Sequence, residues 1–180
     1  MSLIILDRDG VINYDTADFI KSEDEWIPIP GSLEAISQLS QNGYRIIVVS
    51  NQSGISRKKI TITDLNAIHQ KMMAYLAQFG GSIEAIFFCP HGPREGCDCR
   101  KPKPGMLFDI AKRLHISLKD VYFVGDSQRD IDAAEAAGAK PVLVRTGNGA
   151  VLDDSGNVAV DVPVYTDLAE FVNKLLSNAA

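Results

Sequence analysis

The chain has 180 residues, of which 46% are hydrophobic and 23% charged, and its formal net charge is −5. This size and composition predict a single globular domain over residues 1–180. The acidic balance argues against nucleic-acid binding, and no apolar stretch is long enough for membrane association through a spanning helix. Three cysteines do not suggest a disulfide framework, and no signal-peptide core precedes Asp7, so we expect a cytoplasmic protein. We also expect a monomer.

Runs of consecutive apolar residues alternate with segments whose apolar residues recur every three or four positions. The runs predict strands buried on both faces, and the wider spacing predicts helices. In chain order, the sequence predicts a strand at Leu3–Leu6, a helix around Leu33–Leu39, a strand at Arg45–Ser50, a helix around Leu65–Phe79, a strand at Ala85–Cys89, a helix around Leu107–Leu114, strands at Val121–Val124 and Pro141–Val144, and a helix around Leu168–Leu175.

Residues of the expected types mark the ends of these helices. Ser32 and Thr63 are candidate N-caps, and Gly43 and Gly138 follow helices where a left-handed residue is often needed. The alternation of strands and helices predicts an α/β fold with a doubly wound, mainly parallel sheet. Three stretches are predicted as loops or left unassigned: residues 13–29, 90–104 and 151–162.

Four polar segments follow predicted strands or open a predicted helix. They are residues 7–10 (Asp-Arg-Asp-Gly), 50–54 (Ser-Asn-Gln-Ser-Gly), 100–105 (Arg-Lys-Pro-Lys-Pro-Gly) and 125–130 (Gly-Asp-Ser-Gln-Arg-Asp). Each alone is typical of a turn, cap or linker. Ligands of open α/β sheets bind at the carboxyl ends of the strands, where we expect these segments to meet. Asp7 and Asp9 would point to the same side, and such paired carboxylates can hold a hard cation or attack phosphorus.

All three cysteines of the chain lie in one short stretch that also contains a histidine. The stretch supplies Cys89, His91, Cys97 and Cys99. Three thiolates and one imidazole are typical of a closed, tetrahedral, structural zinc site. The alternative is a buried strand cysteine with incidental neighbours. Zinc would order a loop rich in Gly and Pro, and the loop would then place Arg100 and Lys101 beside the polar segments.

The four segments, in this order, resemble the motifs of the haloacid dehalogenase (HAD) superfamily of phosphatases over nearly the whole chain. The resemblance implies a three-layer Rossmann-like fold, a catalytic Mg²⁺ and an aspartyl-phosphate intermediate. The segments between the predicted strands and helices are too short to form a large cap domain over the site. By resemblance, Asp7 is the nucleophile, and Asp7, the Asp9 backbone carbonyl and Asp126 are the Mg²⁺ ligands.

The resemblance also implies roles for the remaining motif residues. Asp9 would protonate the leaving alcohol and later activate water, which calls for a raised pKa. Ser50 would bind phosphoryl oxygens, and Lys101 would neutralise charge on the phosphoryl group and on Asp7. Asp130 would orient Lys101 or a metal-bound water.

Two groups of HAD phosphatases carry a comparable zinc loop: the heptose 1,7-bisphosphate 7-phosphatases of bacterial heptose and lipopolysaccharide synthesis, and the histidinol phosphatases. Residues 7–13, 51–55 and 97–102 resemble the heptose group. Histidinol phosphatases typically have Asp where Ser53 stands here. The stretch between His91 and Cys97 is shorter than in the family. Because the loop keeps all the zinc ligands, the difference concerns the contacts with substrate rather than the zinc site.

A small sugar bisphosphate is therefore the expected substrate, with Arg100 at the phosphate that does not react. The expected substrate contacts are Asp15, Thr16, Ala17, Asp18, Ser50, Asn51, Gln52, Ser53, Arg100, Lys101 and Ser127. Residues 15–18 read equally well as a solvated loop. Residues 57–59 (Arg-Lys-Lys) are interpreted as a solvated helix face or turn rather than a substrate site. His69 and His115 are assigned no role. A phospho-receiver domain and a zinc-bearing binding module are the alternatives outside the enzyme class.

Overall fold

The computed structural model describes residues 2–178. Six strands in this range form one sheet in the order β3-β2-β1-β4-β5-β6. All neighbouring strands are parallel. The strands are β1 (Leu3–Leu6), β2 (Arg45–Asn51), β3 (Ala85–Cys89), β4 (Tyr122–Gly125), β5 (Lys140–Val144) and β6 (Val164–Tyr165). The helices are α1 (Ser32–Gln41), α2 (Ile62–Gln78), α3 (Gly105–Leu114), α4 (Gln128–Ala136), α5 (Gly149–Asp154) and α6 (Leu168–Ser177), with a short 3-10 helix η1 (Glu23–Glu25).

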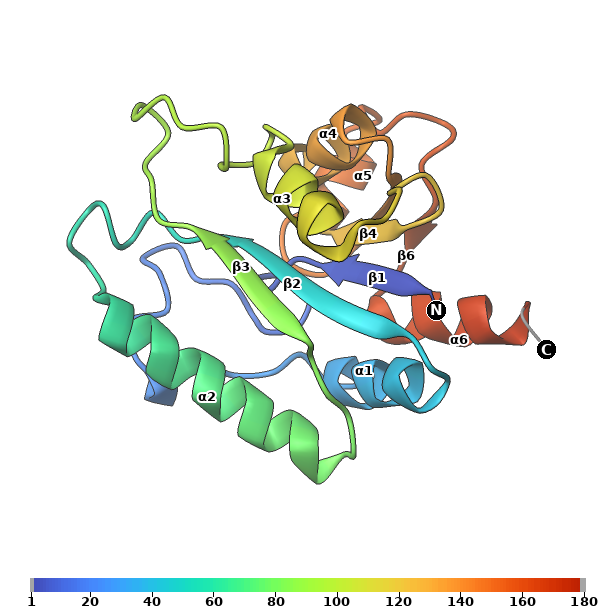
Figure 1. Cartoon of the computed structure of the whole chain (residues 1–180), viewed down its shortest axis with the longest axis horizontal. Coiled ribbons are helices and arrows are strands. Elements are labelled where there is room, and N and C mark those ends of the chain that lie inside the picture. The colour runs from blue at the N-terminus through green and yellow to red at the C-terminus, as the bar shows by residue number, and fades with distance from the viewer. Residues whose placement is uncertain (1, 179–180) are drawn as a thin grey trace.

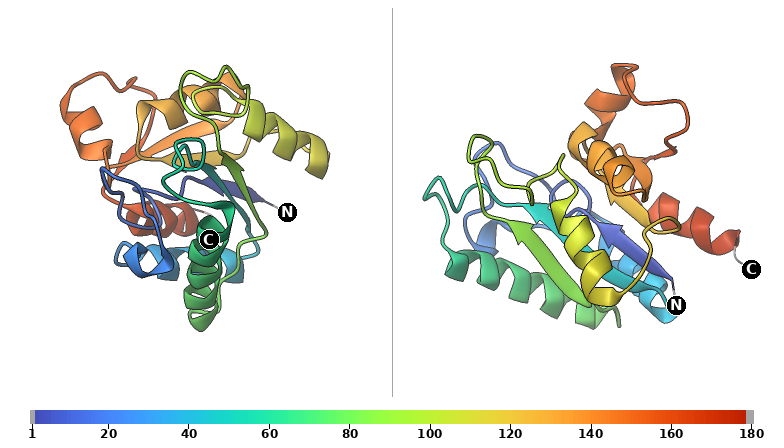
Figure 2. Two further views of the ribbon diagram at one scale, coloured as in Figure 1. Left: turned by 90° about the vertical axis from the view of Figure 1, so that its left-hand side faces the viewer. Right: turned by 45° about the horizontal axis from the view of Figure 1, so that its top comes forward.

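Helices cover both faces of this sheet, so the fold has three layers. Helices α1, α2 and α6 lie on one face, and α3 and α4 lie on the other (Figures 1 and 2). Successive side chains of β1 enter opposite cores: Ile4 and Leu6 pack on the first face, and Leu3 and Ile5 on the second. Burial on both faces explains why the strand is apolar without alternation. The predicted three-layer α/β fold without a large cap is confirmed.

The five predicted strands are present, with ends that differ by no more than one residue at either end. The sixth, β6, has only two residues and was not predicted. Residues 151–162 were expected to form a loop, which is wrong for their beginning, because α5 extends to Asp154. Gly43 and Gly138 have φ values of 77° and 73°, which confirms the left-handed turns predicted after α1 and α4.

Both predicted N-caps are wrong. Helix α1 begins after Gly31 (φ 82°), and the hydroxyl of Ser32 instead donates to the Ile12 carbonyl over 2.7 Å. Helix α2 is capped by Thr61, whose hydroxyl accepts from the Asp64 backbone N–H. The Asp64 carboxylate accepts from the Thr61 N–H in return, which completes a capping box. Phe79, predicted to face the core, is 42% exposed because α2 has ended before it.

Long loops leave the carboxyl ends of β1, β2 and β3 and gather at one edge of the sheet (Figure 1). They comprise residues 7–31, 52–61 and 90–104. Because these strands are parallel and adjacent, all three loops start from the same edge. None of the helices within residues 2–178 is long and apolar enough to span a membrane.

Candidate functional site

A cavity of about 150 Å³ lies at this edge, bordered by the ends of β1, β2 and β4. The predicted site residues that line it are Asp7, Asp9, Asp15, Thr16, Ser50, Asn51, Gln52, Ser53, Arg100, Lys101, Asp126, Ser127 and Asp130. Ala17 and Asp18 do not line it, and Asp18 instead pairs with Lys21 over 2.6 Å on the exposed side of the loop. The fold therefore brings all four polar segments together.

Asp7 directly follows β1 at the base of the cavity, where it is buried. The Lys101 ammonium lies 2.9 Å from Asp7 and 2.6 Å from Asp130. Burial raises the pKa of Asp7 well above its ordinary value; Lys101 opposes this rise, while the charges of Asp130 and Asp126 add to it. Burial lowers the pKa of Lys101, but the two carboxylates outweigh burial and raise it.

Asp126 follows β4 on the other side of Asp7. One of its carboxylate oxygens accepts from the backbone and side-chain N–H groups of Asn148, over 2.8 and 3.0 Å. A side chain at Gly10 or Gly147 would begin 2.1 Å from this same oxygen, so glycine is required at both positions. Burial, with the nearby charge of Asp130, raises the pKa of Asp126 to about 6.

The carboxylates of Asp7, Asp126 and Asp130 offer oxygens within 4.8 Å of one another. Within residues 2–178, Lys101 is the only cation that forms an ion pair with this group. Three buried carboxylates and one ammonium leave an excess of negative charge in a low dielectric, which a divalent cation would balance. The donors are all oxygens, which suits a hard ion such as Mg²⁺.

Asp9 points into the cavity and is held by four donors. The Arg8 guanidinium contacts both carboxylate oxygens, over 2.9 and 3.0 Å. Asn13 and Gln52 donate over 2.9 and 2.8 Å. Burial would raise the pKa of Asp9, but the Arg8 charge and these hydrogen bonds outweigh it and lower the pKa. The predicted rise in the pKa of Asp9 is therefore wrong.

Several side chains predicted to touch substrate are held by the protein itself. Asn51 forms two 3.1 Å hydrogen bonds with the backbone of Lys101, one to its carbonyl and one from its N–H. Gln52 donates to the Ser50 hydroxyl over 2.7 Å as well as to Asp9. The Ser127 hydroxyl donates to Asp130 over 2.6 Å. These contacts fix the positions of the lysine and the two aspartates.

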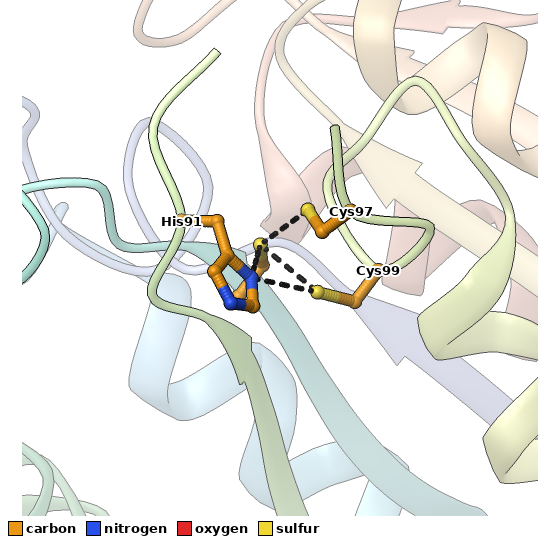
Figure 3. Close-up of side chains that lie close together, drawn as sticks. His91, Cys97 and Cys99 are labelled. Atoms are coloured by element: carbon orange, nitrogen blue, oxygen red, sulfur yellow. Dashed lines mark hydrogen bonds between the residues drawn. The ribbon is translucent and has the colours of Figure 1, made fainter. Parts of the chain in front are cut away.

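The four predicted zinc ligands converge in the loop after β3. His91, Cys97 and Cys99 turn toward a common point (Figure 3). Their ligand atoms and the Cys89 sulfur all lie within 4.8 Å of one another. Distances of 3.1 to 3.6 Å separate Cys89 from the other two sulfurs and from His91 Nδ1. A zinc tetrahedron with thiolate ligands has edges of about 3.7 Å, so the cluster fits the ion with little movement.

The chemistry of these thiols also suits a bound cation. Burial and the neighbouring Cys99 raise the pKa of the Cys89 thiol to about 12, so a cation is needed to hold it as a thiolate. No cysteine of the chain is in a disulfide. The loop packs tightly against the start of α3, because a side chain at Gly105 would begin 2.2 Å from the Asp98 carbonyl.

Some residues at this edge were not predicted. Phe19, Ile20, Arg129 and Asn148 also line the cavity. The pairing of Asn148 with Asp126 left no signal in the local sequence, whereas Arg129 lay inside a motif already singled out. His69, assigned no role, lies 3.2 Å from Arg8. Arg57 and its two lysine neighbours are exposed on a turn, as predicted.

Comparison of the sequence with known proteins identifies the family of this chain. The family model of haloacid dehalogenase-like hydrolases matches residues 4–75, and a HAD-hydrolase-like model matches residues 98–171. A D-glycero-beta-D-manno-heptose-1,7-bisphosphate 7-phosphatase of Pseudomonas putida is 51% identical over 98% of this chain and 100% of its own length. The chain belongs to this phosphatase family. An Escherichia coli member is 42% identical over 80% of this chain and 79% of its own length.

A solved structure of the same family has nearly the same fold as this chain. It is the D,D-heptose 1,7-bisphosphate phosphatase of Bordetella bronchiseptica, complexed with magnesium and phosphate. It is 51% identical to this chain, covers 99% of both chains and superposes with a TM-score of 0.97. The predicted resemblance to HAD phosphatases, and to the heptose group among them, is confirmed.

Proposed function

We propose that this protein is a Mg²⁺-dependent phosphatase that removes the 7-phosphate of D-glycero-D-manno-heptose 1,7-bisphosphate. The observation that carries the proposal is the arrangement at the base of the cavity. Asp7 faces the opening with Lys101 2.9 Å away and with two further carboxylates close by. Relatives named for this reaction match the chain over nearly its whole length.

In the proposed reaction, Asp7, Asp126 and the Asp9 carbonyl hold Mg²⁺, which supplies positive charge to the phosphoryl oxygens and to Asp7. An Asp7 oxygen attacks phosphorus, and the bond from phosphorus to the sugar oxygen breaks. Asp9 gives its proton to the departing alcohol. Asp9 then takes a proton from water, the water oxygen attacks phosphorus, and the bond to Asp7 breaks to release phosphate.

Asp9 must be protonated when the alcohol leaves, although its contacts with Arg8, Asn13 and Gln52 lower its pKa. The charge of an arriving phosphate ester raises the pKa of a nearby carboxyl, because like charges disfavour ionisation. The donors from Arg8 and Gln52 return Asp9 to its carboxylate form once the alcohol has gone. Asp9 can thus serve as acid first and as base second.

The second phosphate of the substrate requires another cationic group. Arg100 and Arg129 both line the cavity, and neither forms an ion pair within the described residues 2–178. Burial and the like charge of Arg129 lower the pKa of Arg100, so the two guanidinium groups repel each other. An anion between them would relieve that repulsion. We assign the non-reacting phosphate to this pair, and the sugar hydroxyls to Asp15 and Thr16.

We also propose that the protein is a cytoplasmic monomer. Three free cysteines in a zinc-binding arrangement suit a reducing compartment. Size-exclusion chromatography with light scattering would test the oligomeric state. A dimer mass at micromolar concentration would contradict it.

The proposed function is tested by phosphate release with Mg²⁺ from heptose 1,7-bisphosphate and from histidinol phosphate, side by side. We expect preference for the bisphosphate, and comparison of the two C1 anomers would follow, since the relatives' names specify the beta form. Preference for histidinol phosphate would show that the proposed substrate is wrong and would leave the proposed mechanism unchanged. Turnover of neither substrate, with stable phosphorylation of Asp7, would indicate a receiver-like protein instead.

A further inference from the structure

Arg8, between the two aspartates of the first motif, is a charged side chain with only 1% of its surface exposed. A buried guanidinium is costly unless its donors are paired. Two of its nitrogens form a fork on the Asp9 carboxylate. The third, Nη1, points away from Asp9 and lies 3.2 Å from His69 Nε2.

His69 reaches Arg8 from the middle of α2. It occupies a position in the buried stripe of that helix, beside Leu65, Ile68 and Met72, where an apolar residue would be the ordinary choice. Its ring is 9% exposed and lies against Phe88 of β3, with 6.3 Å between ring centroids. A polar ring inside an apolar stripe needs a partner, and Arg8 is the partner that the fold provides.

We propose that His69 is a positioning residue for the phosphatase reaction: its Nε2 holds the Arg8 guanidinium, which in turn holds the Asp9 carboxylate in its reactive orientation. This inference rests on the proposed function, because it concerns the group assigned as acid and base there. Arginine stays protonated, so Nη1 donates and Nε2 accepts. His69 is then a neutral ring with its proton on Nδ1.

This arrangement explains why the chain has a histidine here. Without an acceptor at this position, Nη1 would be buried without a partner, and the guanidinium could rotate about its side chain. The fork would then lose its alignment with both Asp9 oxygens. A movement of about 1 Å at a group that transfers protons is enough to slow a reaction substantially.

The kinetic test uses His69→Leu, which removes the acceptor, and His69→Gln, which retains one. The substrate is p-nitrophenyl phosphate, whose leaving group departs as an anion and needs no proton. In single turnovers of the Mg²⁺-loaded protein, we expect His69→Leu to release nitrophenolate within threefold of the wild-type rate, and to hydrolyse the phospho-enzyme at least tenfold more slowly. His69→Gln should recover most of the second rate, and His115→Asn, at an exposed helix end, should match the wild type in both.

A structural role alone would lower both rates together or leave the Leu and Gln variants equal, and either result would overturn the proposal. A second measurement covers the case in which His69→Leu does not fold. Long-range ¹H–¹⁵N spectra of the wild-type protein report which ring nitrogen carries the proton. A proton on Nε2 would overturn the proposed contact. Absence of any phosphatase activity in the wild type would instead contradict the proposed function, and the spectra would still test the contact with Arg8.

Discussion

The ammonium nitrogen of Lys101 lies 2.6 Å from a carboxylate oxygen of Asp130, and both side chains are 2% exposed. The lysine is shared with Asp7, so one cation serves two buried carboxylates. Such a group is stabilising only while it remains intact, because removing one member leaves charges buried without a partner. The same lysine is therefore expected to matter for folding as well as for catalysis.

Replacement of Lys101 by Met should lower the free energy of unfolding by about 3–5 kcal/mol in the absence of divalent cation. The loss should be smaller with excess Mg²⁺, since the ion would neutralise the carboxylates that the lysine leaves behind. Urea denaturation measures both values. The control is Lys103→Met, whose pair with Asp98 is exposed to solvent and should contribute little to stability. Equal losses in the two variants would show that the buried pairs of Lys101 contribute no more to stability than the exposed pair of Lys103.

Asp7→Asn should abolish turnover, by a factor of about 10³ or more, while the protein remains folded. The amide keeps the size of the side chain and removes the nucleophilic oxygen. Phosphate release and circular dichroism test the two halves of this prediction. Asp120→Asn, which changes an exposed carboxylate paired with Lys140, should retain full activity. Substantial turnover by Asp7→Asn would show that another group attacks phosphorus.

Cys99→Ser should lose zinc and melt roughly 10 °C below the wild type, because the cluster orders the loop after β3. Metal analysis of the purified wild type should find one zinc per chain. Chelation should lower the melting temperature before it lowers the rate of reaction with added Mg²⁺. Asp98→Asn, between two of the ligands but exposed, should keep its zinc. A wild-type protein free of zinc would contradict the assignment of the cluster.

Acid should destabilise the protein through His69. Burial and the charge of Arg8 lower the pKa of His69 from 6.5 to about 4. Between these values the unfolded chain takes up a proton that the folded protein does not, so stability falls as the pH drops below about 6.5. The group should account for about 2 kcal/mol of the loss between pH 7 and pH 5. His69→Gln should lack this part of the loss in unfolding curves at the two pH values, and parallel losses would contradict a buried neutral ring.

The strands, the Cys/His cluster and the polar segments at the strand ends could be predicted because each leaves a local pattern. The run Leu3–Leu6, which Asp7 follows directly, indicates both a buried strand and a carboxylate at its carboxyl end. The contact between Arg8 and His69 could not be predicted, because it joins residues 61 positions apart. The direction of the Asp9 pKa depends on donors from Arg8, Asn13 and Gln52, and only the folded chain shows that they converge. The two N-caps were missed because several neighbouring residues at each helix start could serve as the cap.

Asn51 forms one hydrogen bond to the Lys101 carbonyl and accepts one from the Lys101 N–H, near the end of the loop 90–104 that carries most of the Cys/His cluster. They tie the end of the loop to strand β2, so the position of the lysine does not depend on the length of residues 92–96. Those residues can lengthen or shorten while the lysine keeps its place beside Asp7. A change in the length of residues 92–96 is therefore expected to leave the ion pair of Lys101 with Asp7 in place.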